Sequence, residues 1–380
     1  MEHGVEIMRD RKIKILYIVS TLQSTGPTNQ LFGIISNIDM TKFEIYLLTL
    51  SPEPDMSKKE LFSSLPINIF SLNMNRVDFE ISGKRKLRKL LDEIKPDIIH
   101  SCGIRADKSL AGLHMKYKWC NTIRNNVYMD YIPKYGKFIG KIMAAVHIDA
   151  IKKVDYPICC SETLKGYYED LLSRKFYVIQ NGVDCRKFSG AECGEKQKIK
   201  NKYKIDHNRI IIIFVGDLNI RKDPLTIIRV FKMKEINEKC ILYVLGDGEL
   251  LEKCRSEASD NIIFLGKVKN VSEYMKLADG FISASKAEGL PNSVLEAGAC
   301  GIPMLLSDIA EHKEIFGEDF SGIKYFSVND EEDLFMKMKC WIMDLNNVDK
   351  DAIREHILRN FDSKSMSKKY QLFYRSILGR

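Results

Sequence analysis

Long apolar runs are missing from this sequence of 380 residues, and so are the usual marks of a secreted protein. Fully apolar stretches such as Ile210–Val215 are far shorter than the roughly 20 residues that a membrane-spanning helix needs. The segment Met1–Arg11 is charged and lacks the apolar core of a secretory signal. These absences predict a protein of the cytoplasm.

Paired cysteines and metal-binding motifs are absent as well. Ten cysteines are scattered along the chain, with only Cys159 and Cys160 adjacent and no C-x-x-C pair. We therefore expect reduced, mostly buried thiols rather than disulfides or a zinc site. There is no H-E-x-x-H motif and no D-x-D motif placed after a strand. The sequence thus predicts neither a metal nor another cofactor.

The net charge of +8 is carried almost entirely by the first half of the chain. Up to Gln180 there are 27 Lys and Arg against 20 Asp and Glu, whereas the rest holds 32 against 31. The densest basic stretch is Lys84–Leu91, whose leucines recur at helical spacing, and a second one runs from Lys134 to Lys141. Either stretch could dock on an anionic membrane leaflet or be a solvated helix face. No DNA- or RNA-binding motif accompanies the charge, so no nucleic-acid partner is expected.

The apolar runs indicate two series of strands alternating with helices, which is typical of parallel sheets covered on both faces. The expected strands are Ile13–Ser20, Phe43–Leu50, Ile67–Leu72, Asp97–Ser101 and Pro157–Ser161, then Arg209–Gly216, Cys240–Gly246, Asn261–Gly266, Gly280–Ser285 and Ile302–Ser307. The expected helices are Asn29–Asn37, Lys84–Ile94, Arg105–Lys116 and Gly136–Lys153, then Pro224–Glu235, Glu249–Ala258, Val271–Leu277 and Asn292–Cys300. We therefore expect an α/β protein of two doubly wound domains that join near residues 186–208. Ligands of such sheets bind at the carboxyl ends of the strands.

The most informative segment contains two glutamates, Glu288 and Glu296, separated by seven residues. It follows the apolar run Gly280–Ser285, which has the character of a buried strand. If a diphosphate lay between the two carboxylates, each would be near one end of a nucleotide-linked ligand. The alternative is an ordinary strand–turn–helix with two solvated glutamates.

The corner between the two glutamates suits an anion. Gly289 permits a tight turn before Leu290, and Pro291 fits the first turn of a helix, where its missing N–H costs nothing. The amides of Asn292 and Ser293 would then face the ligand at the positive end of the helix dipole. This corner therefore predicts a binding site for a diphosphate.

The segment resembles the E-x(7)-E signature of retaining glycosyltransferases of family 4, which have the GT-B fold of two Rossmann-like domains facing a central cleft. The resemblance covers nearly the whole chain. It implies that Glu288 contacts the transferred sugar and Glu296 the nucleotide ribose. It also implies an acceptor-binding domain at 1–182, a donor-binding domain at 183–362, and a C-terminal helix at about 363–380 that packs back on the first domain.

A second motif, Arg221-Lys222, follows the first strand of the second series. Arg221 offers a planar fork for phosphate oxygens and Lys222 a point charge. The motif resembles the phosphate-binding segment of the family, in which glycine is frequent at the position of Asp223. Two solvated cations before a helix are the alternative.

Further donor contacts are implied by three weaker motifs. Gly246, in a Gly-Asp-Gly turn, resembles the turn that borders the donor in relatives, and Lys267-Val268 lies where relatives present backbone to the base. Gly26-Pro27 stands where the family usually has Gly-Gly, and Gly26 is expected to contact the donor. A plain strand–helix loop is an equal alternative for Gly26.

Two candidate residues lie elsewhere in the first half. Arg124 stands where many relatives have a histidine that points at the transferred sugar, and subgroups in capsule and O-antigen pathways carry Ile-Arg-Asn there. Arg124 could stabilise the leaving phosphate, bind a charged acceptor or pair with an acidic residue such as Asp130. His100 ends a predicted strand and is a candidate for acceptor binding, although a hydrogen-bonded structural histidine is favoured.

The resemblance implies transfer of a sugar, with retention and without a metal, from a nucleoside diphosphate sugar to an acceptor. UDP is the favoured nucleotide, and a lipid-linked glycan in capsule, O-antigen or exopolysaccharide synthesis is the expected acceptor. We expect the protein to be cytoplasmic, with peripheral attachment to the inner face of the cytoplasmic membrane. The alternatives are a non-hydrolysing sugar-nucleotide epimerase, which shares the two-domain plan without this Glu-Gly-Leu-Pro…Glu pattern, and an inactive nucleotide-sugar-binding protein.

Overall fold

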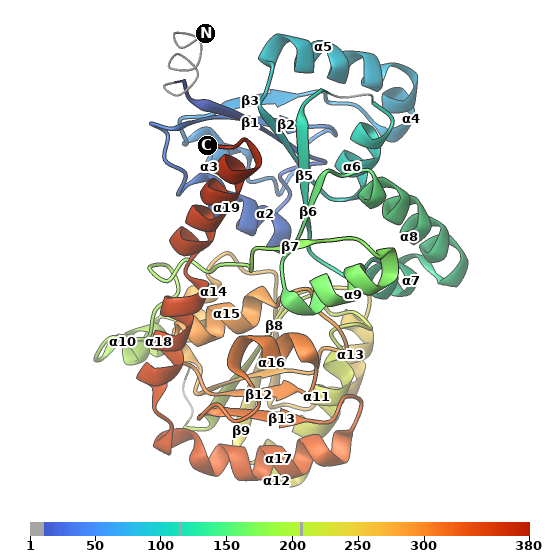
Figure 1. Ribbon diagram of the computed structural model, residues 1–380. Coiled ribbons are helices and arrows are strands. Elements are labelled where there is room, and N and C mark those ends of the chain that lie inside the picture. The colour runs from blue at the N-terminus through green and yellow to red at the C-terminus, as the bar shows by residue number, and fades with distance from the viewer. Residues whose placement is uncertain (1–10, 114–115, 206–207) are drawn as a thin grey trace. The chain divides into compact units, whose positions relative to one another are not determined.

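The computed structural model describes residues 11–113, 116–205 and 208–380, and the chain forms two compact units (Figure 1). Unit 1 runs up to Asn181 and includes the C-terminal segment Ser363–Arg380, whereas unit 2 is Gly182–Asp362. The boundary between the units lies after Asn181, whereas the sequence predicted it after residue 182. Within the described residues, no helix combines the length and apolarity needed to cross a bilayer.

Unit 1 is built on a parallel sheet of seven strands in the order β3-β2-β1-β4-β5-β6-β7. β1 lies between β2 and β4, so that Tyr17 is opposite both Leu47 and His100. The strands are β1 (Ile13–Val19), β2 (Phe43–Thr49), β3 (Asn68–Ser71), β4 (Ile98–Cys102), β5 (Lys118–Ile123), β6 (Tyr156–Cys159) and β7 (Tyr177–Val178).

Helices cover both faces of this sheet because successive side chains of a strand point to opposite faces. Tyr17 packs in a cluster with residues of α2 (Gly26–Ile35) and α19 (Ser363–Ile377), whereas Leu16 and Ile18 pack with α5 (Lys84–Ile94) and α6 (Ile104–Ala111). The remaining helices of unit 1 are α3 (Lys59–Ser63), α4 (Arg76–Asp78), a π-helical turn η1 (Phe79–Gly83), α7 (Val127–Tyr135), α8 (Lys137–Lys152) and α9 (Glu162–Leu172). β1 is therefore buried on both faces, as in other doubly wound sheets.

The C-terminal helix α19 belongs to the core of unit 1 and lies beside α2 (Figure 1). Tyr374 on α19 is buried, and its hydroxyl lies 2.8 Å from Tyr17 Oη and 2.6 Å from His100 Nδ1. Ser367 Oγ donates to the carbonyl of Ile34 in α2 at 2.8 Å. The segment at about 363–380 thus returns to the first unit after the chain has completed the second.

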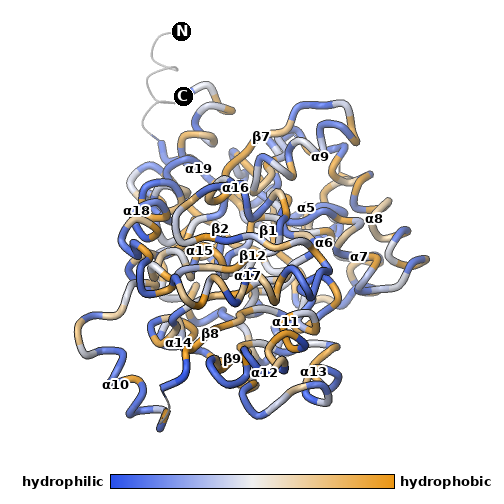
Figure 2. Tube along the Cα trace, turned by 90° about the horizontal axis from the view of Figure 1, so that it is seen from below, coloured by the Kyte–Doolittle hydropathy of each residue, from blue (hydrophilic) through white to orange (hydrophobic). Residues whose placement is uncertain are grey.

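Unit 2 contains a parallel sheet of six strands in the order β10-β9-β8-β11-β12-β13, which is the order 3-2-1-4-5-6 of a Rossmann fold counted from its first strand. The strands are β8 (Ile210–Val215), β9 (Cys240–Leu245), β10 (Ile262–Gly266), β11 (Gly280–Ser283), β12 (Met304–Ser307) and β13 (Ile323–Phe326). β8 consists of apolar residues only, and so does β9 apart from Tyr243; apolar stretches of this kind are orange in Figure 2. Such continuous apolar runs fit strands that are covered on both faces.

The helices of unit 2 alternate with these strands. They are α10 (Glu195–Lys202), α11 (Pro224–Phe231), α12 (Lys234–Asn237), α13 (Leu251–Glu257), α14 (Val271–Leu277), α15 (Asn292–Ala299), α16 (Ala310–Phe316), α17 (Glu331–Asp344), the 3-10 turn η2 (Leu345–Asn347) and α18 (Lys350–Phe361).

Three strands were not expected from the sequence: β5, the two-residue β7 and β13. β5 contains the polar residues Asn121 and Thr122, which hid the strand from a search for apolar runs. Both side chains are buried inside the unit, where Asn121 Nδ2 donates to Asp107 Oδ2 at 3.0 Å. β13 is a short edge strand with an exposed lysine, Lys324. Edge strands are often short and charged because one of their sides has no partner strand.

Two expected helices depart most from the pattern, whereas Gly136–Lys153, Glu249–Ala258 and Asn292–Cys300 are each shorter by one to three residues. Pro224–Glu235 is two helices, α11 and α12, because the backbone becomes extended at Met233 (φ −63°, ψ 131°). Arg105–Lys116 begins one residue earlier, at Ile104, and ends at Ala111, where Gly112 follows as the C-cap; residues 114–115 of that prediction lie outside the described residues.

Candidate functional site

Two loops in the middle of unit 2 bring the predicted charged residues together. β8 and β11 are neighbours in the sheet, with Ile212 opposite Gly280, and each strand leads into a loop at its carboxyl end. The amide of Lys286 in the second loop donates to the carbonyl of Arg221 in the first at 2.8 Å. The loops therefore lie side by side at the edge where open α/β sheets bind ligands.

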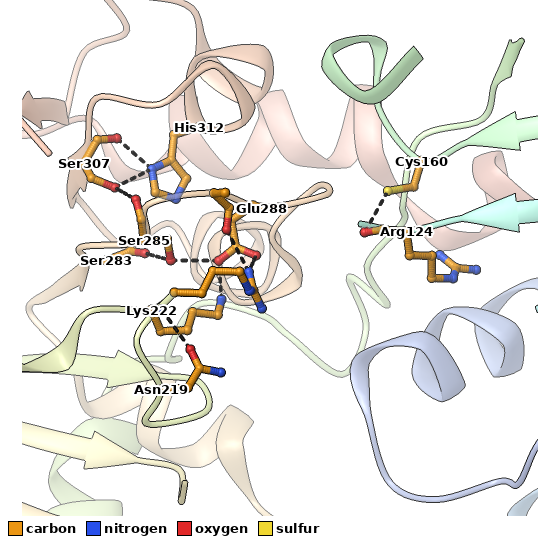
Figure 3. Close-up of polar contacts among 11 residues, drawn as sticks. Arg124, Cys160, Asn219, Lys222, Ser283, Ser285, Glu288, Ser307 and His312 are labelled. Carbon is orange, nitrogen blue, oxygen red and sulfur yellow. Dashed lines mark hydrogen bonds and ion pairs between the residues drawn. The ribbon is translucent and has the colours of Figure 1, made fainter. Parts of the chain in front are cut away.

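Glu288 is bound by both cations that the sequence singles out (Figure 3). Arg221 Nη1 donates to Glu288 Oε2 at 2.7 Å, and Lys222 Nζ pairs with Glu288 Oε1. Ser285 Oγ donates to the same Oε1 at 2.7 Å. The side chains of Glu288, Arg221 and Lys222 are only 6, 17 and 13% exposed. The three predicted residues thus form one largely buried cluster with an excess of one positive charge.

The charge of Glu288 is fixed by this cluster. Burial alone would raise the pKa of Glu288, but the charges of Arg221 and Lys222 and the hydrogen bonds from Lys222 and Ser285 outweigh it and hold the pKa well below its usual range. Glu288 is therefore ionised at neutral pH, and the reading of Glu288 as a solvated glutamate is wrong.

The backbone conformation at residue 223 explains why aspartate can stand where the family often has glycine. Its φ of 46° is in the left-handed region, which glycine adopts freely and aspartate tolerates better than most residues. Asp223 Oδ2 also accepts from Thr226 Oγ1 at 2.9 Å and lies 3.2 Å from Lys286 Nζ. These contacts hold the turn that carries Arg221 and Lys222 into the site.

The Gly-Leu-Pro corner leads into α15, as the sequence predicts, but with a small shift. Pro291 is the residue that precedes the helix (φ −73°, ψ 111°) rather than part of its first turn, because its ψ is extended. Asn292 and Ser293 are therefore the first two helical residues, and Glu296 lies one turn further along. Gly289 and Leu290 are buried in the corner itself.

Gly246 is required by a close approach of two loops. A Cβ built at Gly246, whose φ is 151°, would lie 1.8 Å from the carbonyl oxygen of Gly216. The amide of Gly246 donates to the carbonyl of Gly266 at 2.9 Å. Lys267 and Val268 follow Gly266 directly, with Lys267 exposed and Val268 half-buried. The turn therefore brings the carboxyl ends of β8, β9 and β10 together.

Three polar residues behind Glu288 were not singled out from the sequence. Ser285 Oγ binds Glu288, Ser307 Oγ donates to the carbonyl of Ser285 at 2.6 Å, and His312 Nδ1 donates to the carbonyl of Ser307 at 2.8 Å (Figure 3). His312 is fully buried, and burial lowers its pKa to about 4 although the carbonyl of Ser307 opposes this, so the ring is neutral. The one available signal was a serine at the end of each of two apolar runs.

In unit 1, Arg124 directly follows β5, at the carboxyl end of that strand. Its Nη1 donates to Asn181 Oδ1 at 2.6 Å. Its carbonyl accepts from Cys160 Sγ at 3.7 Å (Figure 3). The alternative in which Arg124 pairs with Asp130 is not what the structure has, because no ion pair joins them within the described residues.

The acceptor-side role predicted for His100 does not fit its position. His100 is fully buried in β4, with Nδ1 2.6 Å from Tyr374 Oη and Nε2 2.8 Å from Thr122 Oγ1. Burial, and to a lesser degree the charge of Arg124, lower its pKa to about 3. His100 is thus the hydrogen-bonded structural histidine that the sequence favoured, and it holds α19 against the sheet.

Gly26 is the first residue of α2, so the helix begins three residues before the predicted start at Asn29. The N-cap residue Thr25 makes no side-chain capping bond, and Pro27 occupies the first turn. The loop from β1 therefore ends at a helix N-terminus whose first amides carry no cap from Thr25.

Two models of protein families match this chain, one over most of each unit. A family model described as "Glycosyltransferase Family 4" matches residues 30–187, and one described as "Glycosyl transferases group 1" matches residues 195–354. A curated relative, "O-antigen biosynthesis glycosyltransferase WbnH" of Escherichia coli, is 27% identical over 371 residues, covering 96% of this chain and 99% of that protein.

Two further relatives are matched over a shorter range. "Uncharacterized glycosyltransferase MJ1069" of Methanocaldococcus jannaschii is 30% identical over 64% of this chain, which spans 62% of that protein's length. An Escherichia coli enzyme named "UDP-Gal:alpha-D-GlcNAc-diphosphoundecaprenol alpha-1,3-galactosyltransferase" is 28% identical over 62% of this chain and 64% of its own length. Among solved structures, Anabaena Alr3699/HepE in complex with UDP and glucose has a TM-score of 0.78 at 14% identity, covering 96% of this chain and all of that one.

Proposed function

The chain belongs to the family 4 type of GT-B glycosyltransferases, which confirms the family and fold expected from the sequence, and we propose that it builds a bacterial surface polysaccharide. In this proposal it moves a sugar from a nucleoside diphosphate sugar, with UDP favoured, to a lipid-linked glycan, and the new bond retains the anomeric configuration. The observation that carries the proposal is the buried cluster of Glu288, Arg221 and Lys222 at the carboxyl edge of the unit 2 sheet.

The donor is bound by unit 2. Arg221 and Lys222 bind the diphosphate, since a guanidinium and an ammonium are the strongest partners that side chains offer to phosphate oxygens. Glu288 contacts the sugar and Glu296, one turn into α15, the ribose. The remaining contacts come from the loops around the cluster, at Gly246, Lys267, Val268, Gly289, Leu290, Pro291, Asn292 and Ser293, and from Gly26 in unit 1.

Catalysis needs charge stabilisation more than proton transfer by the protein. The acceptor hydroxyl attacks the face that the diphosphate leaves, and the leaving phosphate oxygen takes its proton. Glu288, which is ionised, stabilises positive charge that develops on the sugar. Arg221 and Lys222 neutralise the departing diphosphate, so the proposed reaction is independent of metal. Arg124 binds an anionic group of the leaving diphosphate or of the acceptor.

The names of three similar proteins support the choice of donor, acceptor and pathway. The relative named for UDP-Gal and a diphosphoundecaprenol-linked GlcNAc uses a UDP-sugar and a lipid-linked acceptor, and the Anabaena neighbour was solved with UDP and glucose. The WbnH relative is named for O-antigen biosynthesis. We carry these features over to this chain as its proposed donor, acceptor and pathway.

A surface of unit 1 suits a membrane that carries the acceptor. Four apolar side chains of α8 form an apolar stripe that is 40 to 78% exposed: Phe138, Ile139, Ile142 and Val146. Exposed lysines flank it at Lys134, Lys137 and Lys141. An exposed apolar stripe beside basic residues is the pattern of a helix that lies in the interface of an anionic bilayer. We therefore propose peripheral attachment of unit 1 to the inner face of the cytoplasmic membrane.

A donor panel tests the function. The protein is incubated with UDP- and GDP-sugars, with and without sugar-diphosphate acceptors on a short polyprenyl chain, and products are identified by mass spectrometry and NMR. We expect transfer from one UDP-sugar with the anomeric configuration kept. Epimerised donor without acceptor would replace the proposal with an epimerase, and donor binding without turnover on every acceptor would leave a nucleotide-sugar-binding protein.

A further inference from the structure

We propose that Arg124 forms a site on unit 1 for the diphosphate group of the lipid-linked acceptor. The inference rests on the proposed function and goes beyond it, because it names the part of the acceptor that unit 1 binds and the residue that binds it.

Arg124 is held in place by neutral partners. It follows the last residue of β5, and its Nη1 donates to Asn181 Oδ1 at 2.6 Å. Asn181 is the last residue of unit 1 before the chain enters unit 2 and is itself buried. A short bond to a buried amide fixes the direction of the guanidinium at the carboxyl edge of the sheet, where α/β sheets bind their ligands.

No carboxylate neutralises Arg124 within the described residues. Its Nη2 is buried there without a hydrogen-bond partner. Arg221 in unit 2 is paired with Glu288, and Arg229 is paired with Glu257 and Glu331. Arg124 is therefore treated differently from these two arginines, whose charges are matched inside the protein.

The titratable groups around Arg124 are neutral too. Burial lowers the pKa of His100 to about 3, which leaves the imidazole uncharged at neutral pH. Burial raises the pKa of Cys102 to about 12 and also raises that of Tyr370, although the charge of Arg124 opposes both shifts. None of the three can supply a negative charge to the guanidinium.

A partly buried cation without a counter-ion costs stability, because its lost hydration is not replaced. A buried donor without a partner in a native structure calls for an explanation, and an anion that binds there is one. A guanidinium has the fork geometry that matches phosphate oxygens. The ligand of Arg124 is therefore an anion, and a phosphate group fits it well.

The chain that follows Arg124 favours the acceptor over the donor as the source of that phosphate. α7 begins three residues later, at Val127, and packs against α8, which carries the apolar stripe and its lysines. In a sugar linked through diphosphate to an isoprenoid lipid, the diphosphate lies between the glycan and the apolar chain. Along the chain, Arg124 at the sheet edge is followed by the hairpin of α7 and α8 with its apolar stripe. A cation for the diphosphate is thus followed by an apolar surface for the isoprenoid chain. The donor diphosphate already has Arg221 and Lys222.

Binding of an isoprenyl diphosphate tests the proposal. Farnesyl diphosphate, with farnesol as the uncharged probe, is titrated by calorimetry into the whole protein at saturating UDP, so that Arg221 and Lys222 are occupied. We expect R124Q to weaken farnesyl diphosphate binding about 10- to 100-fold, the effect of losing a charge-assisted contact. Farnesol and UDP should bind as they do to the wild-type protein. R124K should restore part of the affinity because it keeps the charge without the fork.

A second variant guards against a change in folding. N181D supplies Arg124 with the carboxylate that it lacks, so it should weaken farnesyl diphosphate binding while the temperature of unfolding stays the same or rises. R375Q, which removes an exposed charge of α19 in the same unit, is the matched control and should leave binding unchanged.

Three results would overturn the proposal. They are no binding of farnesyl diphosphate to the wild-type protein, unchanged binding to R124Q and N181D, or a loss of UDP affinity in R124Q equal to the loss for farnesyl diphosphate. The last result would place the leaving diphosphate at Arg124 instead. Failure of the proposed donor site is distinguishable from all three, because it would show as unchanged UDP binding in R221A.

Discussion

Replacing Glu288 with glutamine should make the protein bind free UDP more tightly while it loses activity. In the protein, the carboxylate of Glu288 accepts from Arg221 at 2.7 Å and pairs with Lys222, the two cations proposed to hold the diphosphate. The donor must therefore take these cations from a buried carboxylate. Glutamine keeps the shape of the side chain but removes the charge that competes with the ligand.

The expected size follows from the two contacts. A charge-assisted hydrogen bond contributes about 1.5–3 kcal/mol and a neutral one about 0.5–1.5 kcal/mol, so each contact weakens by roughly 1 kcal/mol in E288Q. UDP binding should gain about 2 kcal/mol, or roughly 30-fold in Kd. The free energy of unfolding should fall by about 3 kcal/mol, because two largely buried cations lose their counter-charge. Turnover should fall far more than donor binding changes.

Calorimetric titration of UDP at pH 7 checks this, with urea unfolding and transfer assays on the same preparations. E257Q is a matched control: Glu257 pairs with Arg229 at 2.8 Å but ends α13, away from the carboxyl edge of the sheet. It should leave UDP affinity unchanged. Because the pKa of Glu288 is held below its usual range, the ratio of wild-type to E288Q affinity should not vary between pH 6 and 8. Unchanged or weaker UDP binding by E288Q would show that the diphosphate does not displace Glu288.

Three further outcomes are expected. R221A and K222A should each weaken UDP binding about 10- to 100-fold, as measured by calorimetry. Each should also lower the free energy of unfolding in urea by about 3 kcal/mol, because each breaks a buried ion pair with Glu288. E296Q should weaken binding of UDP but not of inorganic pyrophosphate, because its partner is the ribose, and equal binding of UDP by both proteins would contradict that role. In liposome co-sedimentation, replacing Phe138 and Ile142 with serine should reduce attachment to anionic vesicles at any salt concentration, whereas replacing Lys84, Arg85, Arg88 and Lys89 with glutamine should matter only at low salt. Equal sedimentation with neutral and anionic vesicles, or none with either, would leave the basic helix as a solvated face.

The strands could be predicted from the sequence where they are apolar, and the prediction failed where a strand contains polar residues. Apolar runs such as Ile210–Val215 clearly indicate buried strands. The predicted bounds of α14 match the structure at both ends, because Val271–Leu277 has a clear helical pattern. β5 was missed because Asn121 and Thr122 are polar, and only long-range partners in α6 and α19 explain their burial. Local pattern cannot report such partners.

The sequence predicted which charged residues belong to the candidate site but not which of them form ion pairs with one another. The spacing of Glu288 and the position of Arg221-Lys222 placed all three residues at strand ends, which is why the structure brings them together. That they bind one another depends on β8 and β11 being adjacent in space although far apart in sequence. His312 was missed for the same reason, since it reaches the site from the start of α16 through Ser307.

The two arginines of the proposed sites therefore predict changes of affinity that are confined to one ligand each. Arg221 already has a carboxylate, so its ligand must displace an internal anion, and removing that anion in E288Q should strengthen binding. Arg124 has a neutral amide as its side-chain partner within the described residues, so its ligand meets no competitor, and adding an anion in N181D should weaken binding. A general change of surface potential would instead let each variant change the affinity for both ligands, since each variant alters one unit of charge. The two sites are independent if UDP responds to position 288 alone and farnesyl diphosphate, at saturating UDP, to position 181 alone.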